Sequence, residues 1–177
     1  MFQEIYTKDN EENFYVGKKL GRKENFYVGK KLGRKENFYL YELIDDKGRF
    51  LSISLIHKNI INKTIDSSEY LDLMSSFVKT NDKFFDIFNL SRDFEAKKFN
   101  FSHLLNKNIL YARRKKDLIE ISKVVKVKEE SLFLGKIDSP LYDSIGEELS
   151  EVLFSDFEKV DIVSVEEYLM RQYLKKM

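Results

Sequence analysis

The clearest folding signal in this chain is the pair of segments FYLYELI at 38–44 and RFLSISLI at 49–56, which are separated by DDKG at 45–48. Aromatic and β-branched residues favour strands, and Asp and Gly are typical turn residues. In the second segment apolar residues alternate with serine, so one face of that strand is expected to be buried. The sequence therefore predicts an antiparallel β-hairpin at this position.

Directly before this hairpin the chain contains a repeat. Residues 12–23 and 24–35 both read ENFYVGKKLGRK, and a third copy starts with ENFY at 36–39 before the sequence diverges. FYV favours a strand, whereas two glycines in each unit disfavour a helix by about 1 kcal/mol each. Each unit is predicted to form a short strand, a turn and a second short strand. We therefore expect residues 1–35 to form a β-ribbon extension and residues 36–177 to form a single α+β domain.

The rest of the chain contains both helical and strand patterns. Asp66 and Glu69 have capping-box spacing before a stripe of apolar residues, which predicts a helix over about 67–79. Further elements are predicted as a short helix at 92–98, a second hairpin at 117–127 and 131–137, a helix from Ser139 to about 158, and a final helix that opens at Ser164–Glu167. The predicted fold class is α+β, with an N-terminal antiparallel β-meander that includes the duplicated unit, a second β-hairpin, and amphipathic helices in the middle and at the C-terminus.

The composition excludes several classes of function. The chain has 177 residues and no cysteine, and its two histidines, His57 and His103, lie on unrelated segments. We therefore expect no disulfide, no metal site and no cofactor. No run of about 18 apolar residues occurs, so no membrane-spanning segment is predicted. The N-terminal sequence has neither the basic start nor the apolar run of a secretory signal, and we expect a cytoplasmic protein.

Charge is unevenly distributed, although the formal net charge is only +1. Residues 1–35 contain nine Lys and Arg against five Asp and Glu, whereas residues 138–177 contain four against ten. In the repeat, cations alternate with aromatic residues, a composition that suits phosphate neutralisation combined with base stacking. The candidate nucleic-acid-binding residues of the repeat are Tyr15, Lys18, Lys19, Arg22, Lys23, Tyr27, Lys30, Lys31, Arg34 and Lys35. Buried aromatic residues, with lysines that protect a strand edge, would explain the same pattern.

A second basic cluster lies before the second predicted hairpin. It consists of a tyrosine and four consecutive cations, and such a concentration of positive charge needs solvent or an anion. Its candidate residues are Tyr111, Arg113, Arg114, Lys115 and Lys116. A charged connecting loop is the alternative interpretation. Together with the repeat, this cluster makes non-enzymatic binding of nucleic acid or a nucleoprotein the leading hypothesis.

Two other functions are compatible with the sequence. The acidic C-terminal helices, through Glu147, Glu148 and Glu151, would let a small inhibitor or adaptor, of the kind that mobile elements encode, bind a basic protein surface. In the segment RDFEAKK, Glu95 and Lys97 have the Glu-x-Lys spacing of metal-dependent nucleases. The flanking serine and lysines favour an exposed turn there instead of a buried strand end. We therefore predict no catalytic residue and do not expect an enzyme.

Overall fold

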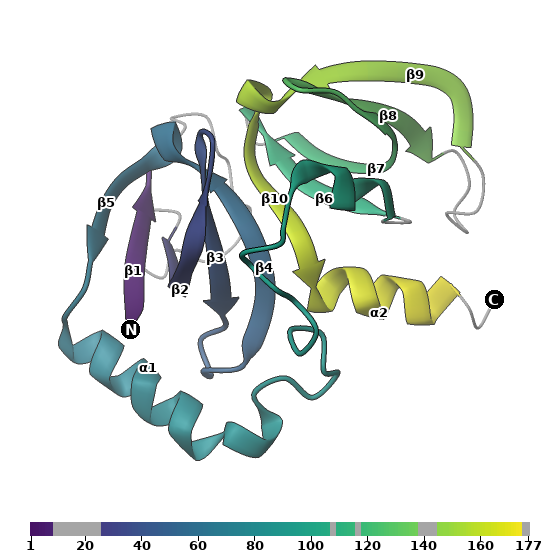
Figure 1. The fold of residues 1–177 in the computed structure, drawn as a ribbon. Helices are drawn as coiled ribbons and strands as arrows, with labels where there is room; N and C mark the ends of the chain where they lie inside the picture. The colour runs from purple at the N-terminus through teal and green to yellow at the C-terminus, as the bar shows by residue number, and fades with distance from the viewer. Residues whose placement is uncertain (9–25, 107–108, 116–117, 138–144, 175–177) are drawn as a thin grey trace, which may run out of the picture.

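The computed structural model describes residues 1–8, 26–106, 109–115, 118–137 and 145–174. Ten strands form one antiparallel sheet in this part of the chain (Figure 1). They are β1 (Phe2–Thr7), β2 (Phe26–Lys35), β3 (Phe38–Ile44), β4 (Phe50–His57), β5 (Ile61–Ile65), β6 (Leu110–Arg114), β7 (Leu118–Val127), β8 (Ser131–Ile137), β9 (Ile145–Leu153) and β10 (Phe157–Ser164). Their order in the sheet is β5-β1-β2-β3-β4-β10-β6-β7-β8-β9.

The ten strands divide into two units of five that have the same topology. In the first unit, β1 to β4 form a meander, the 3-10 turn η1 (Lys58–Ile60) follows β4, and β5 returns to pair with β1. In the second unit, β6 to β9 form a meander, the 3-10 turn η5 (Phe154–Asp156) follows β9, and β10 returns to pair with β6. β4 pairs with β10, so the two units share one continuous sheet (Figure 1).

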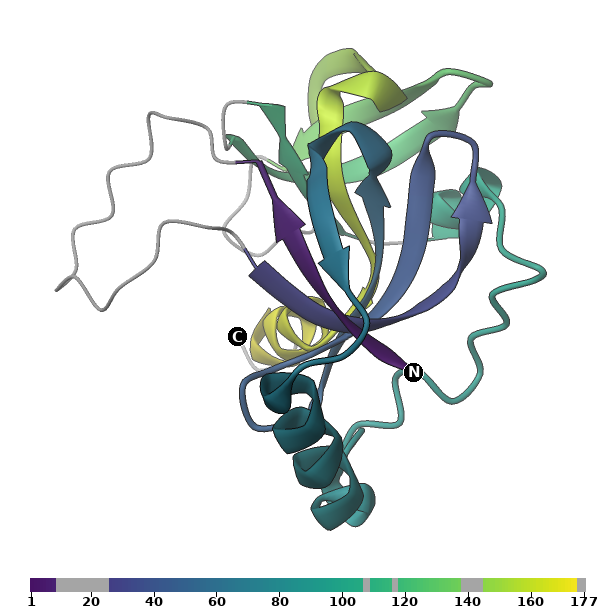
Figure 2. The ribbon, with the colours of Figure 1, turned by 90° about the vertical axis from the view of Figure 1, so that its left-hand side faces the viewer.

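The segment between the two units contains α1 (Glu69–Thr80) and the 3-10 turns η2 (Asp82–Phe84) and η3 (Phe101–Asn106). Ser68 caps α1, because its side chain accepts a hydrogen bond from the Leu71 amide. Figure 2 shows α1 below the first unit, on which Leu71 and Met74 pack. A second helix, α2 (Val165–Leu174), follows β10. No helix in the described residues is long and apolar enough to cross a membrane.

The sheet buries apolar residues on both of its faces around β3. Phe38 and Leu40 point to a large cluster that the second unit lines with residues such as Leu134 and Val160. Tyr41 and Leu43, at alternate positions, point to the opposite face, where a smaller cluster is lined by the strands of the first unit. The large cluster therefore joins the two units, the smaller one belongs to the first unit, and β3 and β4 contribute to both.

The α+β fold class predicted from the sequence is wrong, because most described residues belong to one large sheet with two short helices. The main error is the helix expected from Ser139 to about 158. Residues 145–158 instead form β9, η5 and the start of β10, and residues 138–144 lie outside the described part. Val152 is 2% exposed, whereas Leu149 and Leu153 are 52% and 48% exposed. Buried and exposed residues therefore alternate in this segment, as they do in a strand and not in a helix.

Several smaller predictions can also be compared with the structure. The helix near 67–79, both hairpins and the final helix from Ser164 are confirmed as α1, β3–β4, β7–β8 and α2. The short helix at 92–98 is wrong, since that segment forms turns without a helix. Before it, the Asp86 carboxylate accepts hydrogen bonds from the Leu90 and Ser91 amides at 2.9 and 2.7 Å, and this polar cap holds the chain in an irregular path.

The described repeat copy does not form the strand, turn and strand that we expected. Residues 26–35 form one ten-residue strand, with an irregularity between Lys31 and Gly33. Gly29 allows β2 and β3 to approach each other closely, because a Cβ at that position would lie 2.7 Å from the backbone oxygen of Glu42 on β3. This strand pairs with β1 and β3. Residues 12–23 lie outside the described part, and the division of the chain at residue 35 stays a prediction.

Candidate binding surfaces

The described cations of the repeat lie on two different faces of β2. Lys31 and Arg34 are opposite Tyr41 and Tyr39 in the register, whereas Lys30 is opposite Glu42 on the other face. Lys31, Arg34 and Lys30 are all exposed. Lys31 Nζ lies 3.6 Å from the centroid of the Tyr39 ring, a cation–π contact. Among the described side chains of this copy, Lys31 and Arg34 therefore share one surface. Lys35 belongs to β2, and nothing further is described for its side chain.

Tyr27 packs against the core of the first unit. Its ring contacts the apolar cluster of Ile5, Tyr41 and Leu43, and Lys159 Nζ lies 5.6 Å from the ring centroid. A ring held in this way is half-buried, which reduces the face available to an unpaired base. The other predicted residues of the repeat, Tyr15, Lys18, Lys19, Arg22 and Lys23, lie outside the described residues.

The second basic cluster is paired with carboxylates. Ion pairs of 3.2 Å join Arg113 to Glu158, Arg114 to Glu120 and Lys115 to Asp156. These pairs arise because β6 is an inner strand between β10 and β7, which bring acidic side chains beside it. The charge of the cluster is therefore largely balanced within the protein. Tyr111 is half-buried, and burial, with the negative charge of Glu166, raises its pKa. Lys116 lies outside the described residues.

The predicted acidic residues belong to a strand at the edge of the sheet. Within the described residues, β9 pairs with β8 only. Glu148 and Glu151 are exposed on β9, and Glu147 belongs to the same strand. Glu151 Oε1 accepts hydrogen bonds from Ser131 Oγ at 2.6 Å and Lys128 Nζ at 3.2 Å, which lower the pKa of its carboxyl. The lowered pKa keeps this group ionised further into the acidic range.

A groove with a mixed lining adjoins the same edge. It has a volume of about 600 Å³, and its apolar lining residues are Ile119, Ile121 and Leu149. Its polar and charged lining residues are Glu120, Ser122, Lys136, Glu148 and Ser150. Ile119 is 54% exposed, comparable with Leu149. Exposed apolar side chains next to an open strand edge are typical of surfaces that bind another protein. Sequence reasoning missed this groove, and the signal that could have indicated its β9 side is the segment IGEELSEVL, in which apolar and acidic residues are interleaved from Ile145 onward.

A buried polar cluster fastens β4 to β10. Asp161, which is 2% exposed, accepts a hydrogen bond of 2.5 Å from Ser54 Oγ and forms an ion pair of 2.8 Å with Lys159. Ser52 Oγ lies 2.7 Å from Ser54 Oγ. Burial by itself lowers the pKa of Lys159, but Asp161 and Tyr27 outweigh this effect and raise it. Lys159 is therefore a fixed cation with no capacity to act as a base, and the cluster joins the two units.

The nuclease-like residues lie in an exposed and irregular segment. Glu95 forms an ion pair of 2.8 Å with Lys98, and their side chains are 61% and 73% exposed. Lys97 is exposed in the same turn. Neither residue is at the end of a buried strand, where such sites hold their metal ion. In the described part of the chain, no group of three or more His, Asp or Glu side chains could hold a metal. The nuclease alternative stays untested.

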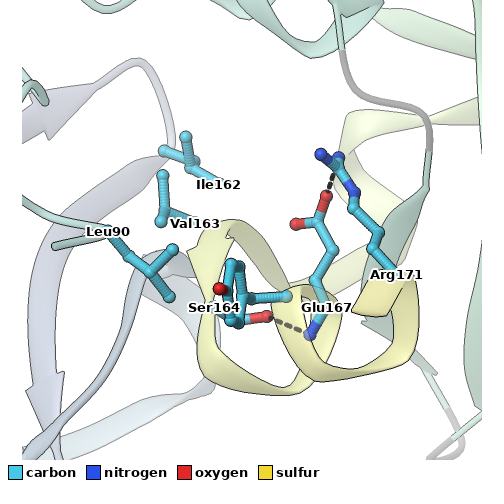
Figure 3. Close-up of a pocket in the computed structure, with 7 residues that line it drawn as sticks. Leu90, Ile162, Val163, Ser164, Glu167 and Arg171 are labelled. Carbon is cyan, nitrogen blue, oxygen red and sulfur yellow. Dashed lines mark hydrogen bonds and ion pairs between the residues drawn. The ribbon is translucent and has the colours of Figure 1, made fainter. Parts of the chain in front are cut away.

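A smaller pocket lies where β10 leads into α2 (Figure 3). It has a volume of about 250 Å³, and Leu90, Ile162 and Val163 line its apolar side. The Glu167 amide donates a hydrogen bond of 3.1 Å to Ser164 Oγ, and its carboxylate pairs with Arg171. These contacts cap α2 and neutralise the charges at the pocket. The pocket is below the usual size of a small-molecule site, about 300–1,000 Å³.

Comparison of the chain with protein-family models, with curated proteins and with solved structures found no match.

Proposed function

We propose that this chain is a non-enzymatic protein-binding module, an adaptor or inhibitor, whose β9 edge takes up an extended basic strand of a partner protein. One observation carries the proposal. β9 is an edge strand on which exposed carboxylates, Glu148 and Glu151, are interleaved with the half-exposed Leu149 and Leu153. The acidic residues are those that the sequence indicated for a partner surface, but a strand presents them in place of a helix.

Strand addition suits this edge for physical reasons. The unpaired N–H and C=O groups of an edge strand supply hydrogen bonds to any extended peptide, and the side chains of the edge select among peptides. Val152 anchors β9 in the core at 2% exposure, so the strand is held in place before a partner arrives. Lys or Arg opposite Glu148 and Glu151, with apolar residues opposite Leu149 and Leu153, would complement the edge.

A labelled nine-residue peptide of Lys and Val tests this proposal, with two Lys three residues apart to face Glu148 and Glu151 and with Val to face Leu149 and Leu153. Its fluorescence anisotropy should rise with protein concentration, and the affinity should fall with added salt because carboxylates contribute to binding. The double substitution Glu148→Lys/Glu151→Lys should weaken binding by about tenfold or more. A matched control, Glu129→Lys/Glu130→Lys in the exposed turn between β7 and β8, makes the same change of charge on residues outside β9. Equal loss in both variants, or no binding at low salt, would reject the proposal.

Nucleic-acid binding is the second candidate, and it is supported by the shared surface of Lys31 and Arg34 beside Tyr39. Anisotropy of labelled single-stranded DNA and RNA across a salt series tests it. Lys31→Glu/Arg34→Glu should abolish a salt-dependent signal, whereas a signal unchanged by these substitutions would exclude this surface. For either ligand we propose a cytoplasmic location, where a chain without cysteine needs no oxidising compartment.

A further inference from the structure

The two units agree in detail as well as in strand order. β2 and β7 both have ten residues, β3 and β8 both have seven, and a three-residue 3-10 turn joins the fourth strand to the fifth in each. An offset of 96 residues aligns η1 with η5. The same offset also aligns an irregularity in strand pairing. Asn62 is skipped where β5 pairs with β1, and Glu158, 96 residues later, is skipped where β10 pairs with β6. The chain therefore contains one structural unit twice.

The two units meet where a fourth strand of one unit pairs with a fifth strand of the other, and the corresponding strands of each unit form the two edges of the sheet. β4, the fourth strand of the first unit, pairs antiparallel with β10, the fifth strand of the second. The remaining fourth strand is β9 and the remaining fifth strand is β5, and these are the two edges of the ten-stranded sheet (Figure 1). Each molecule therefore has one complete junction inside it and one half of the same junction at each end.

We propose that β9 of one molecule pairs antiparallel with β5 of a second copy of this chain, and that this contact repeats the internal junction of β4 with β10. The inference rests on the proposed function, because it names the partner of the β9 edge. Each bound molecule presents a new free edge, so the contact joins molecules head to tail.

The internal junction gives the register of the proposed contact. Inside the molecule, Lys159 is opposite Ile56, Val160 is opposite Leu55, and Asp161 is opposite Ser54. The offset of 96 residues converts these pairs into Lys63 opposite Val152, Thr64 opposite Glu151, and Ile65 opposite Ser150.

The β5 edge has the properties that this register requires. Asn62, Lys63 and Thr64 are exposed, and β5 pairs with β1 only within the described residues. Lys63 occupies the position of Lys159, which the internal junction accommodates beside Asp161. In β5 the position of Asp161 is occupied by Ile65, and Lys63 Nζ instead lies 4.3 Å from the centroid of the Tyr6 ring. β5 carries one charged residue, the exposed Lys63, and the exposed Asp66 follows it, whereas every charged residue of β9 is acidic.

Charge also selects the head-to-tail arrangement over a symmetric one. Two β9 edges facing each other would bring together strands that both carry carboxylates, and like charges across a strand pair are unfavourable. Two β5 edges facing each other would bring lysines together, which is unfavourable for the same reason. Only when β9 faces β5 does a strand that carries carboxylates lie beside a strand that carries a lysine, so the assembly does not stop at a dimer.

Sedimentation equilibrium of the full chain tests the inference. The weight-average mass should rise with concentration beyond twice the chain mass of 21.1 kDa, and it should fall as salt is added. Glu148→Lys/Glu151→Lys and, separately, Lys63→Glu should each shift half-assembly to about tenfold higher concentration or more. Mixing these two variants should restore assembly, because each supplies the charge that the other lacks. Glu129→Lys/Glu130→Lys is the matched control and should assemble as the unmodified chain does.

The outcomes separate this inference from the proposed function. A chain that is monomeric at about 1 mM but binds the Lys/Val peptide at β9 would overturn the inference alone. A monomeric chain that binds no such peptide would overturn both. A species that stops at a dimer, or a mixture of the variants that fails to assemble although each variant has the circular dichroism spectrum of the unmodified chain, would also overturn the head-to-tail contact.

Discussion

The substitution Asp161→Asn should be strongly destabilising, because it removes the negative charge that neutralises the buried Lys159 of the same strand. The introduced amide keeps an oxygen that can accept the hydrogen bond from Ser54, so the change isolates the ion pair with Lys159, which is 2.8 Å long. The side chains of Lys159 and Asp161 are only 14% and 3% exposed. Removing one partner of a buried ion pair costs about 3–5 kcal/mol, and the residual exposure of Lys159 favours the lower limit.

Urea unfolding followed by circular dichroism measures this effect. With a slope of about 2 kcal/mol per molar urea, a loss of about 3 kcal/mol lowers the midpoint by about 1.5 M. The double variant Lys159→Met/Asp161→Asn should recover part of the loss, since no unpaired charge is then buried. A midpoint of Asp161→Asn within about 0.3 M of the unmodified chain, or a double variant less stable than the single one, would refute the role given to this ion pair.

Three further predictions concern stability. Gly48→Ala should destabilise the protein, because Gly48 has a φ of +74° and a Cβ there would lie 2.7 Å from that of Phe77, whereas Gly33→Ala, with open space around it, should leave the melting temperature within about 2 °C. Leu134→Ala should cost about 2–5 kcal/mol in urea unfolding, because Leu134 is 1% exposed in the large core cluster. Burial and the positive charges of Lys115 and Lys58 lower the pKa of His57 in the folded protein. The stability that neutral His57 contributes is therefore complete above its pKa in the unfolded chain, about 6.5, and is lost as the pH falls below that value. His57→Gln should flatten this dependence in a plot of urea midpoints against pH.

Local elements were predictable from the sequence where one pattern dominated. The hairpin of β3 and β4 was visible because turn residues separate two strand-like segments. α1 was visible from its apolar stripe, but its cap is Ser68 and not the predicted Asp66. β9 was mistaken for a helix because Ile145, Leu149 and Leu153 satisfy both a spacing of four residues and a spacing of two. The secondary structure of such a segment depends on the strands that pair with it, and sequence periodicity alone does not identify those strands.

The candidate site was predictable only in part for the same reason. Glu148 and Glu151 were recognised as partner-binding residues from charge, but their place on a strand edge depends on the order of the strands. The pairing of Arg113 with Glu158 likewise depends on β10 lying beside β6. The repeated five-stranded unit was not visible in the sequence, because its evidence is the shared order of strands and the shared irregularity in their pairing.

Amide hydrogen exchange of the full chain at low and high protein concentration tests the central claim most directly. If β9 of one molecule pairs with β5 of the next, amides of both strands should become more protected together at high concentration, while those of the inner strands β3 and β8 should not change. Protection that is independent of concentration at both edges, or that increases at β9 while β5 stays unchanged, would contradict the head-to-tail pairing.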